Sequence, residues 1–266
     1  MNHVYVETCG AGPDLVLLHG WAMHSGVWNG VRDRLAQQYR LHLVDLPGHG
    51  FSAALTGTGE LATLQRMAEA VAQALPARSI VCGWSLGGQV AIELALRQPE
   101  CVRQLVLVST TPSFVQREDW QWGMEATLLQ QFTQDLDQDC TATLQRFCAL
   151  QVRGSSNAGA VLAQLHAILI QRALQRDEPA GAGLQAGLQI LLATDLRAAI
   201  NKIAQPVTLL HGENDAITNA GAARWMNRQL QNSKLVMLPR CGHAPFLSHP
   251  EQFMEIMRRS LNCSYT

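Results

Sequence analysis

The sequence is short of charge. Only 15% of its 266 residues are Asp, Glu, Lys or Arg, whereas 47% are hydrophobic, and soluble domains usually carry about 25% charged residues. Twenty basic residues oppose twenty-one acidic ones, which leaves a net charge of −1. A chain without a basic excess is a poor candidate for a nucleic-acid-binding protein. The apolar content is also too high for a disordered chain.

Long apolar runs are missing as well. The longest, such as 15–18 and 105–108, span four residues, whereas a transmembrane helix needs about twenty. The first residues lack the basic start and apolar stretch of a secretory signal. We therefore expect a cytoplasmic protein that does not associate with membranes.

The cysteines form no C-x-x-C pair, and their number is odd. Widely spaced cysteines in a reducing compartment are more often small buried apolar residues than a disulfide framework, a metal site or a nucleophile. The sequence thus predicts reduced thiols and no metal, and we expect no cofactor. The seven are Cys9, Cys82, Cys101, Cys140, Cys148, Cys241 and Cys263.

Short apolar runs bounded by turn residues alternate with helical patterns along most of the chain. The runs predict strands over 14–19, 39–45, 78–83, 102–108, 206–211 and 234–238. Helices are predicted near 27–38, 63–75, 86–97, 219–230 and 250–261. Buried strands separated by helices are typical of an α/β fold with a mostly parallel central sheet, flanked by helices and joined by right-handed crossovers.

Residues 113–195 interrupt this alternation. They contain no convincing strand but show helical apolar spacing, so we expect a helical lid inserted before the strand that leads to the candidate acid described below. The core would then comprise 1–112 and 196–266. Between 140 and 176 there is no acidic residue, although four arginines occur there: Arg146, Arg153, Arg172 and Arg176.

A G-x-S-x-G motif surrounds Ser85, running from Gly83 to Gly87. The serine follows a predicted strand and opens a predicted helix, which is the setting that this motif requires in a hydrolase. The glycines permit a tight, strained turn that holds the hydroxyl clear of the sheet, at the positive end of the helix. Ser85 is therefore the candidate nucleophile, and the alternative is a serine that only caps the helix.

A serine hydroxyl needs a base to take its proton. His243 follows the last predicted strand and Asp215 follows the one before it, so both lie at the same edge of the sheet as Ser85. The order Ser85, Asp215, His243 is the one expected for a triad on this architecture. Glu213 is a weaker candidate for the acid, because it is too close to the end of its strand. His249 is a weaker candidate for the base, because it precedes a proline at a predicted helix start.

Hydrolysis of an acyl group also needs donors for the oxyanion. The backbone N–H of Leu86 directly follows the nucleophile, and the N–H of Trp21 comes from the loop after an earlier strand. The Trp21 indole is expected to wall an acyl pocket, with plain packing as the alternative. His49 lies in a glycine-rich turn, and we interpret it as structural rather than catalytic.

These motifs resemble the α/β-hydrolase superfamily along essentially the whole chain. Within it the sequence looks like the pimeloyl-[acyl-carrier-protein] methyl ester esterases of biotin synthesis, on the segments 17–24, 42–48, 83–88, 146–151, 187–197 and 243–250. The resemblance implies a serine carboxylesterase that releases methanol from the far end of a carrier-bound pimeloyl chain. It also implies the residues of the substrate site: Trp21, Ser85, Leu86, Phe147, Cys148, Ala149, Leu150, Gln151 and His243.

The resemblance implies acyl carrier protein as the partner. Such carriers are strongly acidic, and the acid-free segment with Arg146, Arg153, Arg172 and Arg176 is a suitable docking surface. Only Arg146 falls clearly on a position that contacts the carrier in the family, while Gly159 and Ala163 stand where relatives can have arginine. A basic face without a partner is the alternative, and we expect a monomer.

Other functions remain open at this stage. The same triad would serve a general short-chain carboxylesterase, a lactonase or a hydrolase of carbon–carbon bonds. A non-catalytic ligand receptor can also keep this fold, although the complete set of Ser85, Asp215 and His243 argues against it.

Overall fold

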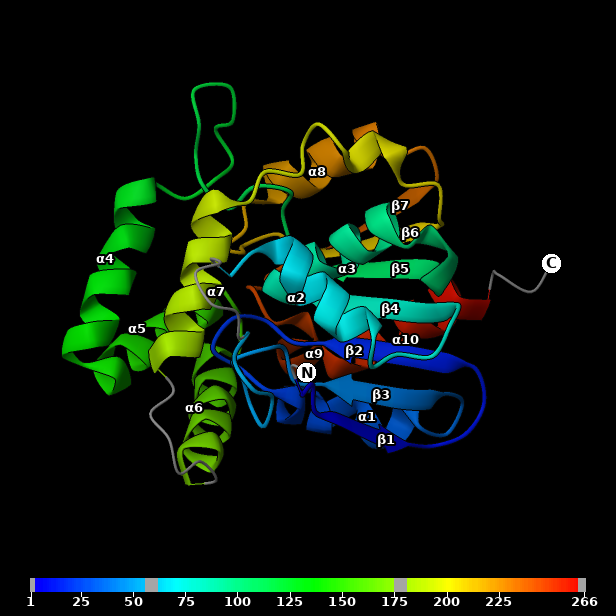
Figure 1. Ribbon diagram of the computed structural model, residues 1–266, viewed down its shortest axis with the longest axis horizontal. Helices are drawn as coiled ribbons and strands as arrows, with labels where there is room; N and C mark the ends of the chain where they lie inside the picture. Colours follow the sequence, from blue (N-terminus) through cyan, green and yellow to red (C-terminus); the bar gives the residue numbers. More distant parts are fainter. Residues whose placement is uncertain (1–2, 56–61, 175–180, 263–266) are drawn as a thin grey trace.

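The computed structural model describes residues 3–55, 62–174 and 181–262. In this part of the chain the strands form one sheet in the order β1-β3-β2-β4-β5-β6-β7 (Figure 1). β1 pairs antiparallel with β3, and every other neighbouring pair is parallel. The strands are β1 Val6–Cys9, β2 Asp14–Leu18, β3 Arg40–Val44, β4 Ser79–Trp84, β5 Val102–Val108, β6 Val207–Gly212 and β7 Ser233–Leu238.

The predicted α/β class is confirmed. Each of the six predicted strands is present with its ends within one residue of the prediction. β1 was not predicted, because its sequence Val-Glu-Thr-Cys is too short to show a pattern. It is recognisable only from its pairing with β3 at the edge of the sheet.

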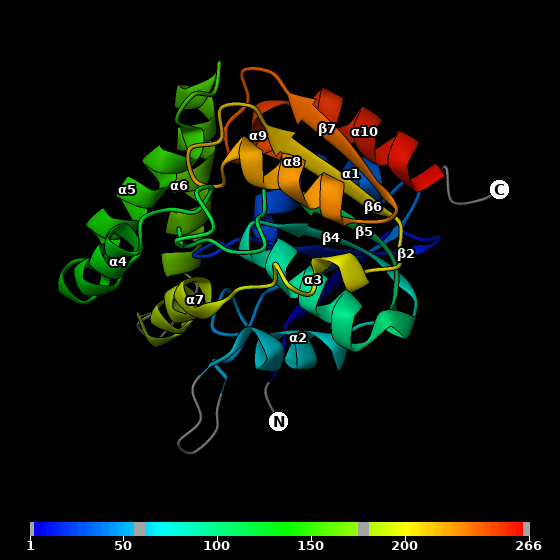
Figure 2. The ribbon, with the colours of Figure 1, turned by 90° about the horizontal axis from the view of Figure 1, so that it is seen from above.

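Two helical layers cover the sheet, because alternate side chains of each strand point to opposite faces. Leu15 and Leu17 of β2 pack into a core with the first helical layer, while Val16 and Leu18 pack into a core with the second. Figure 2 shows the two layers on opposite sides of the sheet. The first layer holds α1 Asn29–Leu35, α9 Pro245–Ser248 and α10 Pro250–Asn262, and the second α2 Leu64–Ala72, α3 Leu86–Arg97 and α8 Ala220–Gln229.

A group of helices lies between β5 and β6 in the sequence and beyond the carboxyl ends of the strands in space (Figures 1 and 2). Leu184 and Leu188 belong to the same buried cluster as Leu18, so this group packs directly on the sheet domain. Two isolated β-bridges, Val115 with Met124 and Arg117 with Trp120, precede the helices. The helices are α4 Ala126–Gln138, α5 Cys140–Val152, α6 Ala158–Leu174 and α7 Gly181–Ala193.

The carboxyl ends of three strands bring the candidate residues to one edge of the sheet. Ser85 follows β4, Asp215 follows β6 by three residues, and His243 follows β7 by five. Short 3₁₀ turns join some elements: Ser25–Trp28, Pro99–Cys101 and Ile200–Lys202. Within the described ranges, the helices are too short or too polar for any of them to cross a bilayer.

Candidate active site

Ser85 sits on a strained turn. Its backbone φ of +57° lies in the left-handed region, which residues other than glycine rarely adopt. The flanking glycines make the turn possible: a Cβ on Gly83 would lie 2.3 Å from the Gly87 carbonyl oxygen, and one on Gly87 would lie 2.5 Å from that of Leu18. The G-x-S-x-G spacing is therefore a steric requirement of this turn.

Hydrogen bonds fix the turn on both sides of the serine. The Ser85 N–H donates to the Val108 carbonyl at 3.0 Å, and the Thr110 hydroxyl donates to the Ser85 carbonyl at 2.7 Å. Ser85 is also the N-cap of α3, so its hydroxyl lies at the positive end of a helix dipole. Leu86, the first residue of that helix, has no intrahelical acceptor for its N–H.

Asp215 and His243 form a buried pair. His243 Nδ1 lies 2.8 Å from Asp215 Oδ2, and both side chains are at most 1% exposed. The other carboxylate oxygen, Oδ1, accepts the backbone N–H groups of Ile217 and Thr218, each at 2.9 Å. The Thr218 hydroxyl donates to Oδ2 at 2.7 Å. Each carboxylate oxygen therefore has two donors, which fix its orientation.

This environment keeps Asp215 ionised. Burial alone would raise the pKa of the carboxyl group, but the charge and hydrogen bond of His243, together with His211 and the Thr218 hydroxyl, lower it from 3.8 to about 2. A group with a lower pKa in the folded state stabilises that state when it is ionised. Asp215 can thus hold one imidazole orientation and stabilise an imidazolium over the whole neutral and mildly acidic range.

We expect a measurable loss of stability on acidification. The Asp215 carboxylate contributes fully to the free energy of unfolding above pH 4, and the contribution, on the order of 2 kcal/mol, disappears as the pH falls through about 2. Urea titrations at pH 5 and pH 2.5 should show a larger drop for the wild type than for Asp215→Asn. Equal drops would show that Asp215 does not make this contribution.

Trp84, which directly precedes Ser85 in the motif, holds His243 against the serine turn. The Trp84 indole N–H donates to the His243 carbonyl at 2.8 Å, and the centroids of the Trp84 and His243 rings lie 5.4 Å apart. On the other side, the His243 N–H donates to the Gln151 carbonyl of α5 at 3.0 Å. The second ring nitrogen, Nε2, is buried and has no hydrogen-bond partner among the described residues. This nitrogen is the one that a serine base needs to keep available.

The loop after β2 reaches the serine closely. A Cβ on Gly20 would lie 3.1 Å from the Cβ of Ser85. His19 Nε2 accepts the Leu46 N–H at 2.9 Å, so its proton is on Nδ1, which donates to the Gly20 carbonyl at 2.7 Å. Because a trans peptide directs its C=O and N–H in opposite directions, this bond also fixes the direction of the Trp21 N–H.

The Trp21 side chain joins the sheet domain to the inserted helices. Its indole N–H donates to the Leu184 carbonyl of α7 at 2.8 Å, and its ring meets Phe147 of α5 edge-on with centroids 4.7 Å apart. A Cβ on Gly187 would lie 2.6 Å from the indole. The predicted pocket wall and the segment 147–151 are therefore neighbours in space.

The segment 147–151 divides between two faces of α5. Phe147 and Leu150 pack on the cluster that contains Trp21, and Cys148 is buried in the other cluster. Gln151 is 1% exposed, and neither atom of its carboxamide has a partner among the described residues. Ala149 is exposed and lines an open groove instead.

That groove has a volume of about 550 Å³, and the predicted docking arginines Arg146 and Arg153 line it together with Phe132 and Leu150. Arg146 forms an ion pair with Asp135 of α4 and also donates to Thr143. Arg153 is exposed and forms no ion pair within the described ranges. Of the other two, Arg172 belongs to α6 and Arg176 lies outside the described residues.

The alternative candidates for the acid and the base, Glu213 and His249, do not take part in the buried Asp215–His243 pair. Glu213 is exposed, and His249 is half-buried at the start of α10, where its ring contacts the Ser248 hydroxyl. His49 packs against His19 with ring centroids 5.4 Å apart, and its Nδ1 contacts the Pro47 carbonyl, in line with a structural role.

The sequence analysis did not identify Thr218 or His19 as residues of the site. Their only signals were a hydroxyl three residues after the acid and a histidine directly before Gly20.

Two of the buried cysteine thiols are not reactive. Burial raises the pKa of the Cys148 thiol to about 12 and that of Cys241 to about 11, so neither is a nucleophile at neutral pH. The six cysteines that the structure describes are free; Cys263 lies outside those residues. Across 3–55, 62–174 and 181–262, no three His, Cys, Asp or Glu side chains are grouped to hold a metal ion.

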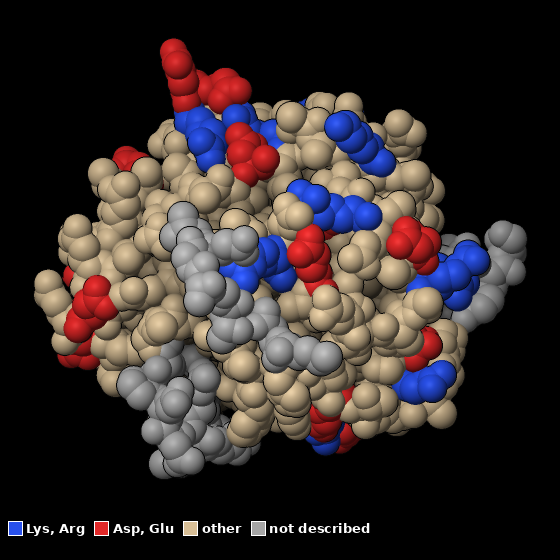
Figure 3. Space-filling view, in the orientation of Figure 1, with Lys and Arg blue, Asp and Glu red and all other residues tan. Residues whose placement is uncertain are grey.

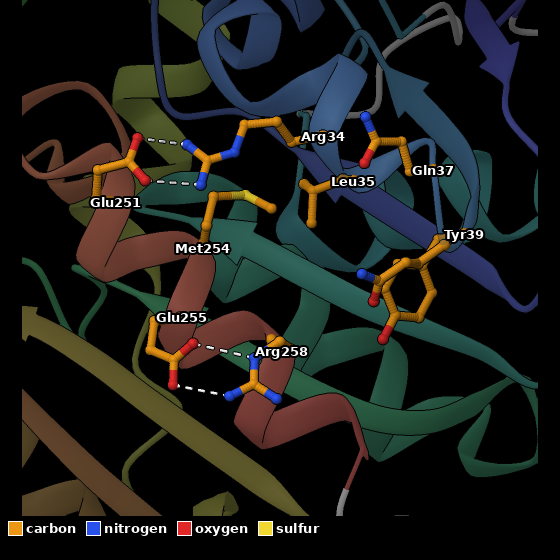
Figure 4. Close-up of a pocket in the computed structure, with 9 residues that line it drawn as sticks. Arg34, Leu35, Gln37, Tyr39, Glu251, Met254, Glu255 and Arg258 are labelled. Carbon is orange, nitrogen blue, oxygen red and sulfur yellow. Dashed lines mark hydrogen bonds and ion pairs between the residues drawn. The ribbon is translucent and has the colours of Figure 1, made fainter.

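A cavity of about 380 Å³ between α1 and α10 is polar, but its charges are paired. Figure 4 shows Arg34 forming two bonds to Glu251, and Arg258 bonded to Glu255. The Arg34–Glu251 contact joins α1 to α10, and the Arg258–Glu255 contact lies within α10. Both arginines are therefore paired, and this cavity offers no free cation for a ligand.

Comparison with known proteins places the chain in a family. Residues 13–250 match the family model of the alpha/beta hydrolase fold. The chain belongs to the α/β-hydrolase family. This α/β-hydrolase is 56% identical over 254 residues to a pimeloyl-[acyl-carrier protein] methyl ester esterase of Nitrosomonas europaea, covering 96% of this chain and 98% of the relative.

Two further comparisons agree. A protein of the same name from Nitrosospira multiformis is 54% identical over 94% of this chain and 95% of its own length. The solved structure of an esterase from Exiguobacterium antarcticum superposes with a TM-score of 0.86 at 26% identity, covering 97% of this chain and 95% of that one. The family resemblance predicted from the motifs is confirmed.

Proposed function

We propose that this α/β-hydrolase is a serine carboxylesterase that hydrolyses the methyl ester of a pimeloyl chain carried on acyl carrier protein, releasing methanol, in biotin synthesis. The observation that carries the proposal is the 56% and 54% identity, over nearly the whole chain, to proteins named for this activity. The buried Asp215–His243 pair beside the strained serine turn supplies the chemistry that such an activity needs.

In the first half of the proposed reaction, the Ser85 hydroxyl attacks the ester carbonyl. His243 Nε2 takes the hydroxyl proton and then gives it to the departing methoxide, which leaves as methanol. Asp215 keeps the His243 proton on Nδ1 and stabilises the imidazolium that forms. A pimeloyl ester of Ser85 remains.

In the second half, His243 takes a proton from water, and the resulting hydroxide attacks the Ser85 ester. The bond between the acyl carbon and the serine oxygen then breaks, the proton on His243 passes to that oxygen, and the free acid is released. In both halves the N–H groups of Trp21 and Leu86 stabilise the oxyanion, each contributing about 3 kcal/mol to the transition state.

Substrate choice tests this proposal. For the purified protein, kcat/KM should be at least a hundredfold higher for the methyl ester of the carrier-bound pimeloyl chain than for short p-nitrophenyl esters. The gene should also restore growth without biotin in a strain that lacks its own esterase for this ester. A preference for the small esters, with no rescue, would favour a general short-chain carboxylesterase with the same triad.

We also propose that the carrier docks along α5. Arg146 and Arg153 lie seven residues apart, about two helical turns, and line the same groove. On the face drawn in Figure 3, acidic and basic side chains lie in small mixed groups rather than in one field of a single sign. That face offers no extended basic field to an acidic partner, and the pair Arg146 and Arg153 is our candidate for its recognition.

Charge reversal tests the docking surface. The double variant Arg146→Glu/Arg153→Glu should raise KM for the carrier-bound ester by about tenfold to a hundredfold, because two attractive contacts become repulsive. Its kcat/KM for a short p-nitrophenyl ester should stay within about twofold. Arg228→Glu, an equal charge change at an exposed position of α8, is the control and should affect neither substrate. Equal losses on both substrates would exclude this docking surface.

A further inference from the structure

His211 is a buried histidine to which the proposed mechanism gives no part. It lies in β6, four residues before Asp215, and its side chain is 2% exposed. Neutral histidines in such positions usually satisfy their polar atoms locally. The partners of this one lead directly to the candidate acid.

The ring nitrogen Nε2 of His211 faces three oxygen atoms. It lies 2.7 Å from the Thr218 carbonyl oxygen, 3.4 Å from the Thr218 hydroxyl and 3.6 Å from Asp215 Oδ2. A carbonyl oxygen can only accept, so Nε2 carries the proton and donates it to Thr218. The hydroxyl of that same threonine donates to Asp215 Oδ2.

His211 makes this bond as a neutral ring. Burial lowers its pKa, and the nearby His243 and Arg224 act in the same direction, while Asp215 and the bond to the Thr218 carbonyl raise it less. A cation at this point would compete with His243 for the charge of Asp215. A neutral donor orients the threonine without that competition.

We propose that His211 is a positioning residue of this active site: its Nε2–H holds Thr218 so that the Thr218 hydroxyl and backbone N–H fix the Asp215 carboxylate against His243. The inference rests on the proposed roles of Asp215 and His243. Oδ2 is shared between the Thr218 hydroxyl and His243 Nδ1, which are 3.5 Å apart. Movement of Thr218 would therefore turn the carboxylate away from the imidazole.

Three variants separate positioning from simple core filling. His211→Met removes the donor while filling similar space and should lower kcat by about tenfold to a hundredfold, since misplacement by ~1 Å can cost about 100-fold, with KM within twofold. His211→Gln can bring an amide N–H to the place of Nε2 and should recover kcat to within threefold of wild type. His211→Asn is equally polar but too short, and should behave like His211→Met.

A double variant tests the route through Thr218. Thr218→Val removes the hydroxyl donor and should also lower kcat by more than tenfold. If both residues act on the same carboxylate, His211→Met/Thr218→Val should be no more than about twofold worse than the poorer single variant. The downfield proton resonance of His243 Nδ1–H should shift or broaden in His211→Met and return in His211→Gln.

The assays use a short p-nitrophenyl ester, so they do not depend on which natural substrate is correct. A loss of kcat that is equal for the Met, Gln and Asn variants, or losses that multiply in the double variant, would overturn the proposal. If His211→Met does not fold, the comparison of Gln with Asn decides alone. Full activity of Ser85→Ala would instead contradict the triad itself.

Discussion

The Ser85→Ala variant is expected to lose about a millionfold in kcat, the size of loss measured when the serine of a serine protease is removed. Without the hydroxyl no acyl intermediate forms, and only the oxyanion donors and substrate binding remain to accelerate attack by water. Stability should change little, because alanine has the same Cβ as serine and meets the same unfavourable φ of +57°.

Ser109 offers a matched control for this variant. It is a buried serine directly after β5, it also has a positive φ, of 43°, and its hydroxyl has no partner among the described residues. Ser109→Ala should keep kcat within a few fold. An organophosphate probe followed by mass spectrometry should label Ser85 and leave Ser109 unmodified. Activity above a few per cent in Ser85→Ala would remove this residue from the nucleophile role.

Local patterns were enough to predict the strand ends at which the candidate residues lie. The G-x-S-x-G motif imposes steric limits on neighbouring residues, so Ser85 is recognisable from five positions of sequence. Asp215 and His243 follow from the order of buried strands, because parallel strands end at one edge of the sheet. The donors that hold the acid were not predictable in the same way. Whether Thr218 faces Asp215 depends on the turn that the intervening residues adopt.

Charge in the inserted helices shows a different limit of sequence reasoning. From 118 to 139 every Asp, Glu, Lys or Arg is acidic, and from 140 to 176 every one is an arginine. The turn between α4 and α5 brings the two groups back together, so that Arg146 pairs with Asp135, eleven residues earlier. A segment without acids is thus not a surface without acids. Arg153, which forms no such pair within the described ranges, is therefore the better candidate for the proposed docking contact.

Asp215→Asn is expected to lower kcat by about ten thousandfold while leaving KM nearly unchanged, as for the equivalent change in a serine protease. The reason lies in the donors around the carboxylate. The backbone N–H groups of Ile217 and Thr218 both point at Oδ1 and need an acceptor there. The carboxamide oxygen will therefore take the Oδ1 position, which places the NH₂ group at Oδ2.

At that position the NH₂ group faces His243 Nδ1 and donates to it. The imidazole must then carry its proton on Nε2, the nitrogen that should receive the proton of Ser85, so the base is present in the wrong tautomer. Glu213→Gln, at the exposed acid two residues earlier, is the control and should keep full activity. An equal loss of kcat in the two variants, or a kcat of Asp215→Asn within tenfold of that of the wild type, would show that the buried carboxylate does not set the tautomer of His243.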